Sequence, residues 1–150
     1  MPSNAMSRET MRDRLVSLLT TKLVPTYAYT VSNGLYDGLE GQSPLVMVFS
    51  SGSRREAGGL GTATFDTWVR LEVQVFVLDA AGAVTQQDVE DTLDDLEKLI
   101  ADVVADNRSD SGYCDYLRHA EEFTRVMSAK IGSWNYQAEI ITLEALDECG

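Results

Sequence analysis

The sequence predicts an α+β fold: a mostly antiparallel twisted sheet of about four to five strands, two main helices packed on it and a long protruding hairpin loop. Residues 67–78 alternate between apolar and polar side chains, which is typical of a strand with one buried face. Residues 7–23 and 85–106 instead carry apolar side chains at helical spacing. A glycine-, serine- and arginine-rich segment, residues 50–66, separates the strand at 67–78 from a shorter one at 45–49.

The first helix, over residues 7–23, has one apolar stripe. Ser7 can cap its first turn, and Pro25 ends it. The apolar positions recur at i, i+4, i+7 and i+8, and they are Met11, Leu15, Leu18 and Leu19. We expect a short strand over residues 27–31, followed by a turn at Asn33 and Gly34 and a loop that leads to the strand at 45–49.

The strand over residues 67–78 is the most regular of the chain. Its apolar face carries Val69, Leu71, Val73, Val75 and Val77. Trp68 and Phe76 lie on the other face, so we expect that face to be covered, by the first helix or by an interface. At ~3.3 Å per residue the strand is ~40 Å long, enough to carry the preceding loop beyond the body of the domain.

The second helix, over residues 85–106, has an apolar stripe and an acidic outer face. Thr85 as N-cap and Asp88 three residues later form a variant of the capping box. The stripe is Val89, Leu93, Leu96, Ile100 and Val103, and the outer acids are Glu90, Asp91, Asp94, Asp95, Glu97 and Asp102. Two interpretations of this face stay open: a solvated surface, or a docking surface for a basic patch on a neighbouring molecule.

The last third of the chain predicts a hairpin over residues 123–146. Gly132 and Ser133 suit a two-residue type II′ turn. The resulting register pairs Ile131 with Trp134, Ala129 with Tyr136 and Met127 with Ala138 on an apolar face, and Lys130 with Asn135 and Ser128 with Gln137 on a polar one. A slip of one residue destroys this sorting, so the pattern specifies the register.

Composition excludes several classes of protein. The formal net charge of −12 opposes direct nucleic-acid binding. No apolar run approaches the ~20 residues that cross a bilayer, and we expect no signal peptide. Residues 1–5, ahead of Met6, look like a cloning remnant, which leaves residues 6–150 as one expected domain. Cys114 and Cys149 are too far apart for a zinc site, and we expect reduced thiols in a cytosol.

No pattern predicts a catalytic, cofactor or metal site. The glycine-rich residues 52–61 lack the lysine and the following helix of a phosphate-binding loop. His119, the one histidine, lies near Cys114, Glu121 and Glu122 without the spacing of metal ligands, and a lone Cys–His pair is usually coincidental. Residues 106–112 resemble a calcium loop in composition, but Arg108 stands where an oxygen ligand is needed.

The candidate functional residues are therefore those of a protein interface. They are Arg54, Arg55, Glu56 and Leu60 in the segment 50–66, and Glu90, Asp94 and Asp95 on the second helix. A loop longer than roughly 12–15 residues usually binds something. If copies assemble head to tail, the arginines of one copy could meet the acidic helix of the next. The alternative is that Arg54 and Arg55 only keep the tip of the loop soluble.

Four segments together resemble a known group of proteins. They are the amphipathic first helix; residues 43–49 leading through the Gly/Arg-rich segment into residues 68–76; the acidic helix at 89–104; and the hairpin that ends at residues 136–145. This layout, which covers nearly the whole chain from Met6, resembles the tail terminator and tail completion proteins of long-tailed (siphovirus-type) phages and prophages. The group is recognised by layout and size and has no catalytic residues to transfer.

The resemblance implies a structural role rather than an enzyme. Subunits of this group form a ring, commonly a hexamer, that caps the head-proximal end of the tail tube, stops its polymerisation and offers a docking surface for the head. The implied partners are other copies of the chain, the tail tube protein and a head completion or connector protein, with no nucleic acid, membrane or cofactor. The implied location is the virion tail, with assembly in the host cytoplasm. The alternatives are another head–tail joining or minor tail protein, or a small ligand-binding or enzymatic domain with residues 50–66 as a lid.

Overall fold

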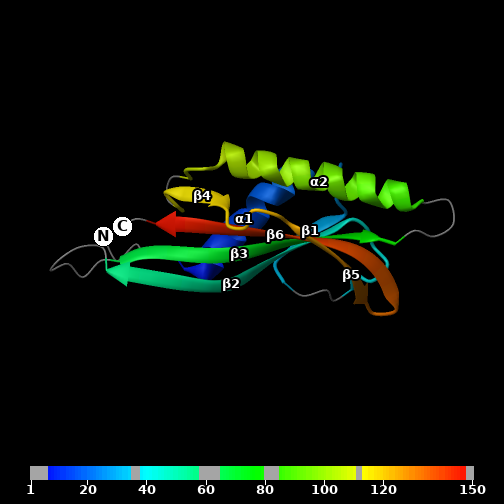
Figure 1. The fold of residues 1–150 in the computed structure, drawn as a ribbon, viewed down its shortest axis with the longest axis horizontal. Helices are drawn as coiled ribbons and strands as arrows, with labels where there is room; N and C mark the ends of the chain where they lie inside the picture. The colour runs from blue at the N-terminus through cyan, green and yellow to red at the C-terminus, as the bar shows by residue number, and fades with distance from the viewer. Residues whose placement is uncertain (1–6, 35–37, 58–64, 80–84, 111–112, 148–150) are drawn as a thin grey trace.

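The computed structural model describes residues 7–34, 38–57, 65–79, 85–110 and 113–147, and in this part of the chain two helices pack on one curled mixed sheet (Figure 1). The helices are α1 (Arg8–Leu23) and α2 (Gln86–Asp106). The strands are β1 (Thr30–Ser32), β2 (Leu45–Ala57), β3 (Phe65–Leu78), β4 (Tyr116–His119), β5 (Arg125–Ile131) and β6 (Trp134–Asp147). The predicted α+β class is confirmed, and the sheet has six strands rather than four to five.

Three long antiparallel strands, β2, β3 and β6, form the middle of the sheet. β1 lies beside the first residues of β2 and runs parallel to it, so the sheet is mixed. β4 and β5 pair with successive parts of the same edge of β6. β6 bends where it pairs with β5, and the sheet curls at that end (Figure 1). The short strand expected at residues 27–31 is therefore shifted to β1, and β4 was not predicted.

Both helices contribute to one core on one face of the sheet. Their buried residues join those of β2, β3 and β6 in a single cluster, which includes the predicted stripes of α2 and of β3. On α1 the buried side chains are Met11, Leu15, Leu19 and Leu23, while Leu18 is only partly buried. The predicted caps are also present: Ser7 accepts a hydrogen bond from the Thr10 N–H, and Thr85 and Asp88 form the capping box.

The expectation that the first helix covers Trp68 and Phe76 is wrong. Both helices pack against the opposite face of β3, because its unbroken row of valine and leucine provides the larger apolar surface. Phe76 is buried instead by the curled end of the sheet, with its ring edge-on to Tyr136 at a centroid distance of 6.2 Å. Trp68 stays on the uncovered face of the sheet, which we call the open face.

The expectation of a loop over residues 50–66 is also wrong at residues 50–57 and 65–66, which belong to strands. β2 continues to Ala57 and pairs with β3 along its whole length, so Arg54, Arg55 and Glu56 are strand residues. The polar half of β2 gives no alternating pattern because its side chains are solvent-exposed on both faces. The ladder to β3 nonetheless satisfies the backbone groups along one edge of this segment, with one irregularity between Ser50 and Gly52. Residues 58–64, which include Leu60, lie outside the described residues.

The C-terminal hairpin has the predicted register. All five predicted pairs, from Ile131–Trp134 to Met127–Ala138, are present between β5 and β6. Ile131, Tyr136 and Ala138 are buried in a second, smaller apolar cluster with residues of β2 and β3, whereas Met127 and Trp134 remain about half exposed. Within the described residues, neither helix has the length and apolar character needed to cross a membrane.

Candidate interaction face

The open face of the sheet carries a row of three hollows, which we call the trough. The first has a volume of about 220 Å³ and lies over Gly52, between Arg54, Trp68 and Arg70. The second, of about 400 Å³, shares Ser51 and Arg70 with the first. The third, of about 290 Å³, shares Ile140 with the second and is lined mainly by apolar side chains. The trough therefore follows the strands from the far ends of β2 and β3 to the curled end of the sheet.

Arginine, tryptophan and glutamate side chains form a connected ladder at the Trp68 end of the trough. Arg118 Nη2 lies 2.7 Å from Glu144 Oε1, and its Nε lies 2.8 Å from the same oxygen. The Arg118 guanidinium also lies 4.8 Å from the centroid of the Trp68 ring. Glu144 therefore fixes an arginine against the indole, and this contact holds Trp68 in place on the open face.

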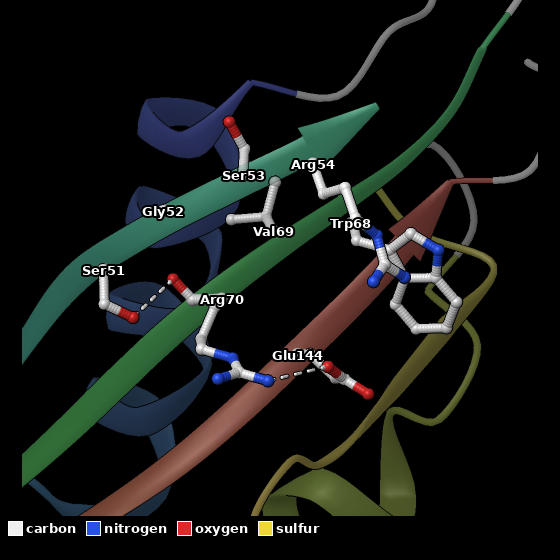
Figure 2. A pocket seen from close by; sticks show the side chains of 8 residues that line it. All are labelled: Ser51, Gly52, Ser53, Arg54, Trp68, Val69, Arg70 and Glu144. Atoms are coloured by element: carbon white, nitrogen blue, oxygen red, sulfur yellow. Dashed lines mark hydrogen bonds and ion pairs between the residues drawn. The ribbon is translucent and has the colours of Figure 1, made fainter. Parts of the chain in front are cut away.

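Two further arginines extend this ladder. Arg54 lies over the Trp68 ring at 5.5 Å, and its Nε contacts Glu56 at 3.1 Å. Arg70 reaches Glu144 at 3.7 Å and Glu121 at 3.9 Å. Figure 2 shows Arg54, Trp68, Arg70 and Glu144 projecting from β2, β3 and β6 on the side turned away from the helix behind the sheet. The ladder thus presents guanidinium groups at the surface of an acidic protein.

A β-bulge produces the first hollow. Ser51 has no residue opposite it on β3, because Ser50 pairs with Leu71 and Gly52 with Arg70. The extra residue shifts the later part of β2 by one position, which places Arg54 opposite Trp68. Gly52 has a φ of +153°, and a side chain built there would have open space around it. The trough is therefore hollow at this point because a glycine faces it.

The other end of the trough is apolar. Phe76, Met127 and Ile140 line it, and Phe123, which is 78% exposed, lines the middle section beside Arg125. Aromatic side chains, methionine and arginine are the residues enriched in the cores of protein interfaces. Tryptophan, tyrosine and arginine also supply most residues that dominate binding energy. The trough thus contains residue types that are enriched in protein interfaces, together with the glutamates that pair with its arginines.

The acidic face of α2 lies on the other side of the molecule. Glu90, Asp91, Asp94, Asp95 and Asp102 are exposed there, and Lys98 pairs with Asp94 at 3.2 Å. Close to this helix, Glu139 is only 8% exposed and accepts a hydrogen bond of 2.6 Å from the Thr124 hydroxyl. Burial raises the pKa of Glu139, and the nearby carboxylates of Glu97 and Asp94 raise it further, against the effect of the Thr124 hydrogen bond.

The predicted site residues divide into separate groups. Arg54 and Glu56 belong to the open face, where Arg54 lines the trough, whereas Arg55 pairs opposite Thr67 on the helix-covered side of β2. Leu60 lies outside the described residues. Glu90, Asp94 and Asp95 are exposed on α2, on the far side of the molecule from the trough. Within one chain, the structure therefore does not bring the arginines and the acidic helix together.

The residues that the sequence offered as a nucleophile or as metal ligands do not form a reactive site among the described residues. Cys114 is buried, and this burial raises its thiol pKa to about 11, so the neutral thiol predominates at physiological pH. His119 is exposed at the end of β4, opposite Leu143. Asp110 binds both Nε and Nη2 of Arg14, at 2.6 Å and 3.1 Å. The described residues contain no group of three His, Cys, Asp or Glu side chains that could hold a metal ion. Cys149 lies outside the described residues.

The sequence did not single out several residues of the trough and of the ladder. The alternation in β3 placed Arg70 on the same face as Trp68, and that was the available signal for it. Arg118 could not be assigned because β4 is too short to show a period, and Glu144 becomes significant only as the partner of Arg118 and Arg70. Phe123 and Arg125 were taken as parts of the hairpin alone.

No protein-family model matches this sequence, and no curated protein matches it. The features of the chain that bear on its function are the trough, the acidic helix and the layout of the elements.

Proposed function

We propose that this chain is a tail terminator-like structural protein of a long-tailed phage or prophage. In this proposal residues 6–150 act as a single domain, and copies form a ring, most simply a hexamer. The ring caps the head-proximal end of the tail tube, stops the addition of tube subunits and offers a surface to the head. The protein works in the virion tail after assembly in the host cytoplasm, and it catalyses no reaction.

The observation that carries the proposal is the uncovered open face with its trough. A curled sheet with helices on one side and an arginine- and aromatic-lined hollow on the other has an inner and an outer surface. A subunit of a ring needs two such surfaces, because it contacts its neighbours on both sides and a tube at one end. The resemblance of the sequence layout to the phage proteins motivates the same proposal, in which β2 and β3 would contact neighbouring subunits.

The proposed mechanism is steric and electrostatic. One end of the ring matches the end of the tube and binds it, while the other end does not accept another tube subunit. Growth then stops without any chemical step. Residues of the ladder such as Arg118, held by Glu144, are pre-organised, so little side-chain entropy is lost when a partner docks there.

The alternative of an enzyme with residues 50–66 as a lid receives less support. Residues 50–57 belong to β2 and are held in its ladder with β3, so this part of the segment is not a free lid. Cys114, the candidate nucleophile, is buried with a raised thiol pKa. The hollows lie on the open face and are lined by arginine, glutamate and apolar side chains.

Tube polymerisation tests the proposal directly. The tail tube protein encoded in the same genome is polymerised with and without the purified chain, and tube lengths are measured by negative-stain electron microscopy. We expect shorter tubes with a ring at one end, and a ring mass in native mass spectrometry of the capped complex. Tubes of equal length in both samples, or capture of portal and head proteins instead of tubes, would overturn the proposal.

A further inference from the structure

We propose that the trough of one copy receives the acidic outer face of α2 of a second copy. The contact is head to tail, because it joins two different surfaces of the same protein. It rests on the proposed function only in taking a second copy of the chain as the partner.

Charge at the Trp68 end of the trough favours an acidic partner. The side chains of Arg70 and Arg118 are 50% and 59% exposed, whereas Glu144 between them is 17% exposed. The positive groups therefore stand outward and the carboxylate that orients them lies beneath. Arg125 lines the middle of the trough and has no ion-pair partner among the described residues. The carboxylates of Glu72 and Glu121 also line the middle hollow, where Glu121 faces Arg70, and Glu56 contacts Arg54. Over the hollows and the ladder, the five cations still outnumber the four carboxylates by one; they are Arg54, Arg70, Arg118, Arg125 and Lys130 against Glu56, Glu72, Glu121 and Glu144.

The outer face of α2 carries the complementary charge. Asp91, Asp95 and Asp102 lie on the side of the helix opposite its buried stripe, at i, i+4 and i+11. The neighbouring Lys98 pairs with Asp94 and also interacts with Asp95, but this one cation leaves a surplus of carboxylates on the face. Carboxylates at i and i+4 repel each other, and a facing guanidinium group would relieve that repulsion. A cationic neighbour therefore lowers the electrostatic repulsion on this face more than solvent does.

The dimensions of the two surfaces match. The trough follows β3 from Trp68 to Phe76, a length of ~26 Å at ~3.3 Å per residue. The 21 residues of α2 span ~31 Å at 1.5 Å per residue. The two surfaces also lie on opposite sides of the molecule, since α2 covers one face of the sheet (Figure 1) and the side chains that line the trough lie on the other. A contact between them leaves a free trough at one end of each pair and a free α2 at the other. Further copies can therefore add in the same way, and the chain of copies can close into a ring.

Other occupants fit the charges less well. A symmetric contact of trough against trough would bring the exposed arginines of two copies together. Nucleic acid would be attracted by the arginines but repelled by a chain with a net charge of −12. The acidic helix of a second copy is attracted to the trough, and each contact covers part of the acidic surface that otherwise keeps copies apart.

A charge exchange tests the contact. One variant carries Arg54→Glu and Arg125→Glu in the trough, and a second carries Asp91→Lys and Asp95→Lys on α2. A third variant combines the four substitutions and so has the net charge of the parent. The control carries Arg8→Glu and Lys22→Glu on α1, which change the net charge as the trough variant does but on exposed residues elsewhere. Sedimentation velocity over a concentration series measures the association constant of each protein, and circular dichroism checks that each is folded.

We expect the parent and the control to associate. Both double variants should have an association constant at least about tenfold lower, and the quadruple variant should recover the association constant of the parent. Association of the parent should also weaken as ionic strength rises. The inference is overturned if the parent stays monomeric at millimolar concentration, if the double variants associate like the parent, or if the quadruple variant does not recover.

The tube assay separates this inference from the proposed function. If the double variants self-associate like the parent and still cap tubes, the proposed trough contact is refuted and the capping role stands. If the parent never shortens tubes but the charge-exchange variants associate as expected, the trough contact stands and the proposed capping function is refuted. Loss of tube binding without any loss of self-association would assign the trough to the tube and overturn the inference.

Discussion

Replacing Tyr136 by phenylalanine should lower the free energy of unfolding by about 1–3 kcal/mol. Tyr136 is fully buried on β6, and its hydroxyl donates a hydrogen bond of 2.7 Å to the Gln42 carbonyl. The same hydroxyl accepts one of 2.9 Å from the Gly41 N–H. Phenylalanine keeps the ring and its edge-on contact with Phe76, so the substitution removes only the two hydrogen bonds.

The magnitude follows from what the substitution leaves behind. A net hydrogen bond is worth about 1 kcal/mol, and a buried backbone group left without a partner costs about 1–3 kcal/mol. Gly41 and Gln42 are half-buried, with the Trp134 ring beside the α-carbon of Gly41, so the effect should lie toward the lower end of this range. For a chain of this length, each 1 kcal/mol lowers the melting temperature by roughly 2–4 °C.

Urea denaturation followed by circular dichroism at pH 7 measures the effect. The exposed Tyr29, replaced by phenylalanine, is the matched control and should change the free energy by less than about 0.5 kcal/mol. Burial raises the pKa of Tyr136, so the phenol is neutral at pH 7 and its contribution is lost only as the pH rises through that raised value. Equal stability of parent and Tyr136→Phe at pH 7 would refute the claim that this hydroxyl holds residues 41 and 42 against β6.

Three further predictions concern the helix side of the fold. Because the folded state raises the pKa of Glu139 above 4.5, the stability that this group contributes is complete below pH 4.5 and is lost as the pH rises through the folded value. Glu139→Gln keeps an acceptor for Thr124, so the variant should be more stable than the parent at pH 7 and lose that advantage below pH 4.5. Thr85→Ala removes the N-cap of α2 and should cost about 0.5–2 kcal/mol in urea denaturation. The pKa of Cys114, raised to about 11, together with its burial, predicts that a thiol reagent such as DTNB labels Cys114 at pH 8 only after urea unfolds the protein.

Each of these predictions has a result that contradicts it. Equal stability of Glu139→Gln and the parent at pH 7 would mean that water or movement of α2 already solvates the carboxylate. An unchanged free energy for Thr85→Ala, beside an unchanged Thr92→Ala control in the same helix, would show that the capping box is not formed. Labelling of Cys114 in the folded protein, followed by mass spectrometry of its peptide, would show that the thiol is not buried.

The sequence alone predicts the parts of the fold in which burial imposes a period. The stripe of α2, the valine row of β3 and the full register of the β5–β6 hairpin are all confirmed. In α2 and β3 one face is buried along its whole length, and in the hairpin β6 buries Tyr136 and Ala138 beside Ile131 of β5, so the order of apolar and polar residues records the local geometry. The caps of α1 and α2 were predictable because they depend on side chains three residues apart.

The polar half of β2 shows where this reasoning fails. Ser50–Arg55 carries no alternating pattern, because both faces of the strand are exposed, and it forms a strand only because β3 offers a ladder of backbone hydrogen bonds. β4 is likewise too short to show a period, and it forms because β6 extends beyond β5 and leaves part of its edge free for pairing.

The candidate site depends on the tertiary structure for a related reason. Arg54, Trp68, Arg118 and Glu144 come from four strands, and their contacts depend on the bulge at Ser51 and on the pairing of β3 and β4 with β6. A sequence specifies which residues alternate along one strand, and it leaves open which residues of distant strands become neighbours. The sequence therefore determined the α+β class, the two helices and the C-terminal hairpin. Only the folded sheet decided that the arginines line a trough on one side of the molecule while the acidic helix faces the other, because long-range strand pairing sets both positions.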